Sequence, residues 1–169
     1  IICINDSSRE NYDSPAYGYY DNNDSLGSIY GCLYNKRAAI FGKLAPYGWH
    51  IPNYDDLMDL WEVLGLQGME QQYYGYSDQY AGDKLRSSTG WNDGGGTDDF
   101  GFCALPGGEF VCYEDSSKIK TSFRYIDRSA DFWVSGEKMG IWGSSYSCTY
   151  LEYAGDKLGL SVRCVKDDE

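Results

Sequence analysis

The sequence has a single histidine, His50, and no Cys-x-x-Cys pair among its six cysteines. A zinc site would therefore need an all-thiolate arrangement of scattered residues. A Ser-His-Asp triad would have to use His50, and no nucleophile-elbow motif accompanies it. The carboxylates of Asp98 and Asp99 are adjacent, so they point apart in an extended chain, whereas a glycosidase needs an opposed pair across a cleft. We expect a protein that is not an enzyme.

Long apolar runs and positive charges are also scarce. No stretch approaches the roughly 20 consecutive apolar residues that span a bilayer, and the start, Ile1 to Asp6, is too short for a signal sequence. We expect a soluble chain without direct membrane insertion, whose export signal was removed or lay upstream. The 26 Asp and Glu outnumber 14 Lys and Arg, giving a net charge of -12. Nucleic acid is not an expected partner, because a phosphate backbone would repel this chain.

Glycine and tyrosine are abundant, with 21 Gly and 17 Tyr in 169 residues, a length that suits one domain with a real core. Recognition loops favour Tyr, Ser, Gly and Asn, because Tyr gives a large contact area at low entropic cost. A loop-rich fold also needs Gly and Asn for turns and Tyr for a small core. Both interpretations stay open on composition alone.

The even number of cysteines, six in a loop-rich chain, indicates disulfides and an oxidising compartment. Each such bridge stabilises a fold by about 2 to 4 kcal/mol, and six cysteines allow about 15 connectivities. The connectivity that we predict pairs Cys103 with Cys112 across a hairpin, Cys148 with Cys164, and Cys3 with Cys32.

The order of patterns along the chain predicts helices first and short strands later, an α+β fold. Residues 1–28 lack helical period, so we expect an extended N-terminal segment packed on a domain of residues 29–169. One short helix is expected to end at Gly42. A longer one is expected from Pro52 to Gly65, because acidic residues follow Asn53 and apolar residues recur at helical spacing. The other predicted elements are a short helix at Tyr80–Ser87 and strands at Phe100–Leu105, Glu109–Tyr113, Ala130–Ser135, Gly140–Ser144 and Leu160–Val165.

Four motifs resemble, in the same order, those of the Fibrobacter succinogenes major paralogous domain family. They are Tyr30–Asn35, Ala45–Pro52, Gly101–Gly108 and Leu160–Val165. The resemblance runs from about Ala16 to the C-terminus and includes the Gly82–Leu85 segment and the Gly90–Asn92 loop. This family is grouped with C-type-lectin-like folds, near the formylglycine-generating enzymes, and its members resemble secreted or surface proteins of Bacteroidetes, Fibrobacteres and their phages. The resemblance implies a loop-rich C-type-lectin-like fold, with two helices packed on short antiparallel strands. It also implies an extracellular or cell-surface location, lipid-anchored or on a phage virion.

Two departures from the family pattern bear on these expectations. Nothing before Tyr12 matches the strand with a Trp-Met-Ala-Glu-Asn-like motif that usually opens the domain. Many members have a cysteine where this chain has Ala45, so the resemblance implies that Cys164 lacks its usual partner, which supports Cys148. His50 stands in the family's Gly-Trp-His motif, and we expect it to be structural, its ring bonding nearby backbone. A single histidine also excludes the multi-histidine iron site of the sulfoxide synthases that share the fold class.

Some relatives resemble the variable proteins of diversity-generating retroelements, in which the stretch before the terminal Ser-Val-Arg-Cys-Val motif carries hypervariable ligand-contacting residues. The corresponding stretch here is Ser135–Leu158, whose mixed aromatic and polar residues suit a ligand-contacting surface. The candidate ligand-binding residues are Glu137, Met139, Trp142, Tyr146, Tyr150, Glu152 and Tyr153. The alternative for Trp142 and Tyr150 is a place in the core.

The Gly-rich loop Gly90–Asp99 places hard oxygen ligands on a flexible backbone, which the irregular coordination of calcium tolerates. These ligands are Asn92, Asp93, Thr97, Asp98 and Asp99, and their spacing is not that of an EF-hand. Asp and Asn also stabilise turns by bonding their own backbone, so a metal-free turn is the alternative to structural calcium, the one cofactor considered. The Glu-Pro-Asn and Gln-Pro-Asp signatures of calcium-dependent sugar lectins are absent, so sugar binding does not follow from the fold.

The leading hypothesis is an extracytoplasmic binding module, either a surface adhesin or lipoprotein or a phage receptor-binding protein. It would recognise a protein or glycan on another cell or surface through Ser135–Leu158. A structural module of a larger surface assembly, homo-oligomers included, is the alternative. An oxidase of the formylglycine-generating type, with Cys148 and Cys164 as its thiol pair, is a distant third.

Overall fold

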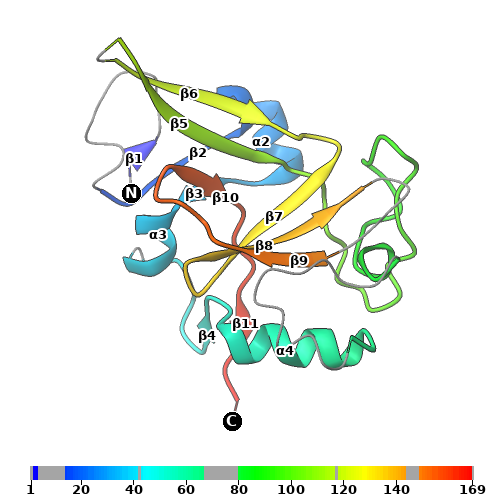
Figure 1. Cartoon of the computed structure of the whole chain (residues 1–169). Coiled ribbons are helices and arrows are strands. Elements are labelled where there is room, and N and C mark those ends of the chain that lie inside the picture. The colour runs from blue at the N-terminus through cyan, green and yellow to red at the C-terminus, as the bar shows by residue number, and fades with distance from the viewer. Residues whose placement is uncertain are drawn as a thin grey trace.

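The computed structural model describes residues 2–3, 14–41, 43–66, 80–116, 118–143 and 149–168 (Figure 1). This part of the chain contains short helices and three small sheets, and none of its helices has the length and apolar character needed to cross a membrane. The helices are η1 Tyr20–Asn22, α2 Asp24–Tyr30, α3 Lys36–Phe41, α4 Tyr54–Val63 and η3 Gly82–Lys84. The strands are β1 Ile2–Cys3, β2 Ala16–Gly18, β3 Leu33–Asn35, β4 Trp49–His50, β5 Glu109–Asp115, β6 Lys118–Arg124, β7 Ser129–Val134, β8 Glu137–Trp142, β9 Thr149–Glu152, β10 Leu158–Leu160 and β11 Val165–Lys166.

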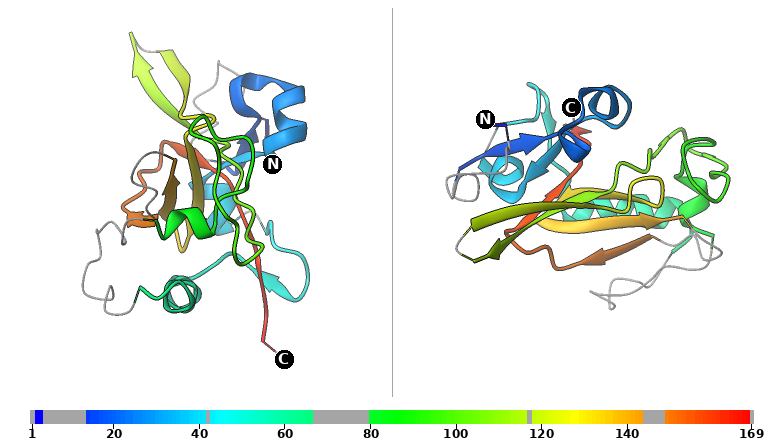
Figure 2. Two further views of the ribbon diagram at one scale, coloured as in Figure 1. Left: turned by 90° about the vertical axis from the view of Figure 1, so that its right-hand side faces the viewer. Right: turned by 90° about the horizontal axis from the view of Figure 1, so that it is seen from above.

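The largest sheet has six strands in the order β1-β2-β3-β10-β5-β6. It joins the two ends of the chain, because β10 pairs with both β3 and β5. Its long β5–β6 hairpin projects from one end of the molecule (Figure 1 and Figure 2). A three-stranded antiparallel meander, β7-β8-β9, and a two-stranded ribbon of β4 and β11 complete the sheets.

Helix α4 begins and ends close to where the sequence predicted. The Asn53 side chain accepts a hydrogen bond from the backbone N–H of Asp56, and the Asp56 carboxylate accepts one from the Asn53 N–H at 2.7 Å. This capping box satisfies backbone groups that the first turn of a helix leaves without a helical partner. Leu57 and Trp61, one turn apart, are buried. The predicted helix from Pro52 to Gly65 is confirmed.

The main hydrophobic core lies between α4 and the β7-β8-β9 meander, and Figure 1 shows α4 running along one side of these strands. Leu57 and Trp61 from the helix meet apolar residues of β7, β8 and β9 there. A second cluster surrounds Phe110 on β5. A third surrounds Trp133 on β7, whose indole N–H donates to the carbonyl of Tyr34 on β3 at 2.7 Å. Trp133 therefore ties the meander to the six-stranded sheet.

The mixture of helices and curled antiparallel sheets agrees with the predicted α+β class. Strands β5, β7 and β8 fall on predicted segments, whereas the predicted strand Phe100–Leu105 forms only an isolated bridge from Ala104 to Arg86. Positive φ angles at Gly101 and Cys103 prevent this segment from extending as a strand. The structure also has helix α2 at the end of the segment that we predicted as loop, capped by the Asn23 side chain.

The predicted bridge between Cys103 and Cys112 is wrong, because both residues carry free thiols. Cys112 lies on β5 with its sulfur 3.6 Å from the hydroxyl oxygen of Thr121 on β6, the strand with which β5 forms its hairpin. Cys103 is exposed in the loop that precedes β5. The two cysteines are therefore not on facing strands, which the prediction required.

The other two predicted bridges involve residues outside the described part of the chain. Cys32 and Cys164 carry free thiols. The side chains of their predicted partners, Cys3 and Cys148, are not among those that the structure describes.

The hexapeptide Tyr-Ala-Gly-Asp-Lys-Leu occurs twice and folds differently in its two copies. Tyr80–Leu85 contains the 3-10 helix η3, whereas Tyr153–Leu158 forms a turn that leads into β10. The repeat therefore marks no repeated structural unit.

Candidate functional site

Two of the predicted ligand contacts belong to the interior, because the β7-β8-β9 meander is covered on both faces. Alternate residues of a strand point to opposite faces. Met139 is 3% exposed and packs in the core beside α4. Tyr150 is 5% exposed, its ring lies across Gly140, where a Cβ would overlap it, and its hydroxyl donates to Asp131 at 3.2 Å. Met139 and Tyr150 are therefore unavailable to a surface ligand, and the core alternative holds for Tyr150.

Tyr153 is the predicted contact that projects furthest into solvent, with 63% of its surface exposed. The Lys36 ammonium on α3 lies 5.2 Å from the centroid of its ring. The side chain of Trp142 and the whole of Tyr146 lie outside the described residues. Of the predicted aromatic surface, Tyr153 is thus the part that the structure places.

The two predicted glutamates hold parts of the fold together. The Glu137 carboxylate accepts a hydrogen bond from the Ala154 N–H at 3.0 Å, which fixes the chain after β9. Glu152 is half-exposed, and its carboxylate lies 2.6 Å from the Lys138 ammonium on the neighbouring strand. Of these two side chains, Glu152 offers the larger exposed area to a ligand.

A buried charged cluster occupies the face of the meander that turns away from α4. The Lys138 ammonium lies 3.3 Å from Glu109 and 3.6 Å from Asp131, in addition to its contact with Glu152. The side chains of Lys138, Glu109 and Asp131 are 7%, 2% and 0% exposed. Glu109 also binds the Arg124 guanidinium at 2.6 Å. Three carboxylates therefore surround one ammonium group inside the protein.

Burial and neighbouring charges both set the pKa values in this cluster. Burial raises the pKa of Asp131 to about 6, and the charge of Glu109 adds to this effect while Lys138 opposes it. Burial alone would lower the pKa of Lys138, but Asp131, Glu152 and Glu109 outweigh burial and raise it. Lys138 therefore stays a cation that holds three strands together and is not a neutral nucleophile.

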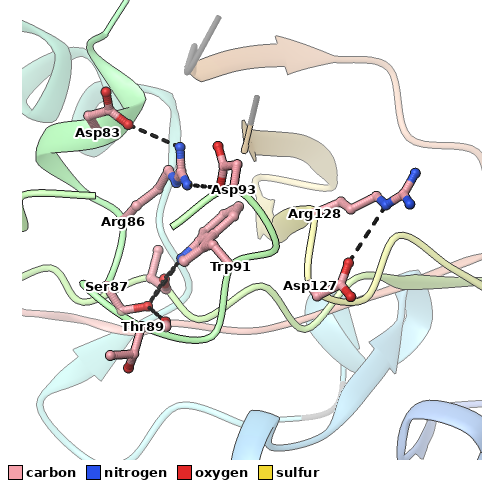
Figure 3. A network of polar contacts seen from close by, with 9 residues as sticks. Asp83, Arg86, Ser87, Thr89, Trp91, Asp93, Asp127 and Arg128 are labelled. Atoms are coloured by element: carbon pink, nitrogen blue, oxygen red, sulfur yellow. Dashed lines mark hydrogen bonds and ion pairs between the residues drawn. The ribbon is translucent and has the colours of Figure 1, made fainter. Parts of the chain in front are cut away.

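The loop that we considered for calcium is organised around Arg86 (Figure 3). The side chain of Arg86 is 1% exposed, binds Asp83 at 3.0 Å and Asp93, and lies 4.3 Å from the ring centroid of Trp91. The Trp91 indole N–H in turn donates to the Ser87 hydroxyl at 3.1 Å. An internal guanidinium thus neutralises the carboxylates of this loop.

The remaining calcium candidates make the contacts of a turn. The Asp98 carboxylate accepts a hydrogen bond from the Cys103 N–H at 2.6 Å, and Asn92 and Asp99 are exposed. No group of three or more His, Cys, Asp or Glu within the described ranges is placed to hold a metal ion. The guanidinium of Arg86 stands among the carboxylates where the calcium interpretation had its cation.

An apolar pocket of about 310 Å³ opens between α4, the α4 side of the meander and the C-terminal segment. The C-terminal segment runs past α4 in Figure 1. The residues that line the pocket are Pro52, Asp56, Leu57, Leu60, Phe102, Phe132, Val134, Met139, Arg163, Cys164 and Val165. Pockets of roughly 300 to 1,000 Å³ with mainly apolar walls are typical of small-ligand sites.

Two residues of the pocket give it chemical character. The Arg163 guanidinium is exposed and lies 4.2 Å from the ring centroid of Phe102. The Cys164 thiol is half-buried in the pocket wall, and burial raises its pKa. Because the thiolate is the reactive form, this environment disfavours nucleophilic chemistry at Cys164.

His50 joins α4 to the C-terminal segment beside the pocket. Its Nδ1 lies 2.7 Å from the Asp167 carboxylate and its Nε2 lies 2.9 Å from the Asp56 carboxylate. The ring therefore bonds side chains and not backbone, as we had expected, because β4 pairs with β11 and places Asp167 alongside it. The hydrogen bonds to Asp167 and Asp56 raise the pKa of His50.

This contact predicts a pH dependence of stability. A pKa that is higher in the folded than in the unfolded chain gives a contribution that is complete below about pH 6.5 and is lost as the pH rises through the folded pKa. We expect the melting temperature of the wild type, relative to that of His50→Gln, to fall across this window. Melting profiles of the two proteins measured from acidic to alkaline pH check this, and parallel profiles would contradict it.

The sequence did not reveal the pocket, because its walls come from three separate segments. Phe132 on β7 and Leu60 on α4 each looked like ordinary core residues. Arg163 stands in the terminal Ser-Val-Arg-Cys-Val motif, which was the one available signal, but nothing local showed that its side chain would border an apolar pocket.

The sequence profile of the Fibrobacter succinogenes major domain matches residues 3–166. The chain therefore belongs to this family. No curated protein and no solved structure matches it.

Proposed function

We propose that this member of the Fibrobacter succinogenes major domain family is an extracytoplasmic ligand-binding module of the C-type-lectin-like fold, with no enzymatic role. The observation that carries the proposal is the pocket between α4, the meander and the C-terminal segment. Its lining is mostly carbon, with polar groups restricted to Asp56, Arg163 and Cys164. A few polar groups beside apolar walls fix the orientation of a bound group, which is the usual design of a binding site.

Other features support a protein that meets a partner outside the cytoplasm. The net charge of -12 keeps the chain soluble and disfavours nucleic acid and anionic membranes. The exposed part of the predicted surface, around Tyr153 and Glu152, lies on the meander and can extend a contact that begins in the pocket. A protein or glycan on a cell surface or virion is the ligand that we propose for the whole module.

Filling the pocket is expected to abolish its capacity to bind apolar groups. In Leu60→Trp the larger ring occupies the space that Leu60 borders on α4. We expect binding of the neutral fluorescent probe phenylnaphthylamine to weaken by about tenfold or more, because the ligand loses its apolar contacts. Fluorescence titration measures this, with melting temperature as the check on folding.

The matched control is Val63→Trp, which adds the same ring to an exposed site of the same helix, since Val63 is 61% exposed. The proposal predicts unchanged probe binding in this control. Equal binding by the wild type and Leu60→Trp, or no binding by either control or wild type, would contradict a ligand site in the pocket.

A structural module of a larger assembly is the second candidate, favoured by exposed apolar side chains on α3. Ile40 and Phe41 are 48% and 63% exposed. Ile40 and Lys36 border the β7–β8 turn at Gly136, and Lys36 reaches the ring of Tyr153. A face of this kind fits subunit packing. Loss of assembly in Phe41→Ser, with probe binding retained, would favour this second candidate.

The oxidase alternative gains no support from the thiols. Cys148 lies outside the described residues. Burial raises the pKa of Cys164, which lowers the thiolate fraction that thiol oxidation chemistry needs.

A further inference from the structure

The walls of the pocket select an apolar group. Backbone donors near it are already used: the N–H of Ser135 donates to the carbonyl of Pro52 at 2.9 Å, and that of Trp133 donates to the carbonyl of Ser161 at 3.0 Å. The Asp56 carboxylate is engaged by His50 and by the backbone of α4's first turn. Hydroxyl groups of a sugar placed among these walls would therefore lose hydrogen bonds to water without replacing them, which is costly.

The size of the pocket limits what enters it. A volume of about 310 Å³ is near the lower end of ligand pockets. It suits one aromatic ring or one branched aliphatic group with a short stem, and not an extended chain.

Arg163 supplies charge at this apolar site. Its guanidinium is exposed over the ring of Phe102, and no carboxylate among the described residues lies within ion-pair distance of it. This is notable in a chain whose 26 acidic residues far outnumber its 14 cations. Arg binds a carboxylate through two parallel hydrogen bonds, and its stacking on an aromatic ring holds the guanidinium plane in place.

We propose that the pocket binds an apolar group that carries a carboxylate, with the apolar group between Leu60 on α4 and Phe132 on β7 and the carboxylate on Arg163. This inference rests on the proposed function and names the ligand chemistry of the same site. A free aryl or branched alkyl carboxylic acid and the C-terminal residue of a protein chain both have this chemistry.

The test uses phenylpropionate and its neutral counterpart phenylpropanol, titrated into the wild-type chain and followed by calorimetry. Arg163→Met keeps an apolar stem over Phe102 and removes the charge. The control is Arg128→Met, since Arg128 is exposed, pairs with Asp127 and does not line the pocket. We expect phenylpropionate to bind more tightly than phenylpropanol, and Arg163→Met to weaken phenylpropionate alone by about three- to tenfold, as for a hydrogen bond to an exposed charge.

The outcomes separate this inference from the function on which it rests. Binding of phenylpropanol and phenylpropionate with equal affinity, unchanged in Arg163→Met, would overturn the carboxylate inference and leave the apolar pocket in place. Failure of both compounds and of phenylnaphthylamine to bind would overturn the pocket itself. Two further probes identify the source of the carboxylate: a short peptide ending in phenylalanine and the same peptide with an amidated C-terminus. A preference for the free over the amidated peptide supports the inference, and indifference between them in the wild type counts against it.

Discussion

Replacing Lys138 with methionine is expected to lower the free energy of unfolding by about 3 to 5 kcal/mol, the cost of leaving buried carboxylates without their cation. Glu109 and Asp131 are almost fully buried around the Lys138 ammonium. The methionine side chain keeps most of the volume of lysine, so the loss reports charge and not a cavity. Urea unfolding of the wild type and the variant measures it.

The matched control is Lys120→Met. Lys120 pairs with Asp115 on the exposed β5–β6 hairpin, where both side chains are about half in solvent. Exposed ion pairs contribute about 0 to 1 kcal/mol, so this change should have little effect. Similar losses in the two variants would contradict the account of a buried cluster.

The loss in Lys138→Met should also grow with pH. The pKa of Asp131 is already raised to about 6 in the folded protein, mainly by burial, and Lys138 opposes that rise. Without Lys138 the folded pKa rises further above its unfolded value of about 3.9. The folded carboxyl then keeps its proton to a higher pH, and stability continues to fall above pH 6 where the wild type no longer changes. A deficit that is equal at acidic and alkaline pH would argue against this cause.

The second large effect is expected from Arg86→Met, which should lower the free energy of unfolding by about 2 to 3 kcal/mol. Arg86 lies between Asp83 and Asp93 and over the ring of Trp91, as Figure 3 shows. The loss is smaller than for Lys138 because both carboxylates are partly exposed and water can solvate them. Without the guanidinium the two carboxylates repel each other, and the Gly-rich loop should move.

Denaturant unfolding measures the loss, and the indole N–H resonance of Trp91 reports the loop. Arg128→Met is the control, because the Arg128 side chain is 63% exposed and its contact with Asp127 spans 3.7 Å. The control should leave both readouts unchanged. If Arg86→Met did the same, the loop would not depend on its internal cation. Added calcium that restored the loop in Arg86→Met would show that the carboxylates can accept a metal once the guanidinium is removed.

Local signals in the sequence predicted helix α4 and the strands with strong patterns. For α4, Asn53 marks the start, acidic residues favour the first turn, and Leu57 and Trp61 recur at helical spacing. Helix α2 was missed because Gly27 interrupts its short apolar pattern, and the ring of Tyr19 packs where a Cβ at Gly27 would stand. That requirement is tertiary and leaves no local trace.

The predicted site illustrates why a surface is harder to predict than a helix. Residues of β8 alternate between the α4 side and the opposite side, but the opposite side is covered as well, so Lys138 and Tyr150 are buried despite their polar atoms. A strand buried on one face by apolar contacts and on the other by ion pairs has the mixed composition of a recognition loop. Only the pairing of Lys138 with Glu109 on a distant strand distinguishes the two.

The cysteines show the same limit. Their even number suggested bridges, but pairing depends on which strands face each other. Cys112 faces Thr121 on β6, and Cys103 lies in a loop with a positive φ. The pocket likewise depends on how α4, β7 and the C-terminal segment meet, which no single segment encodes.

The central claim is that the ligand enters the pocket beside α4 and does not bind on the exposed part of β9. Amide chemical-shift mapping of the ¹⁵N-labelled chain during a titration with phenylpropionate tests this most directly. The account predicts the largest shifts at Leu57, Phe132 and Val165, which line the pocket. Largest shifts at Glu152 and Tyr153, or no shifts at saturating ligand, would contradict it.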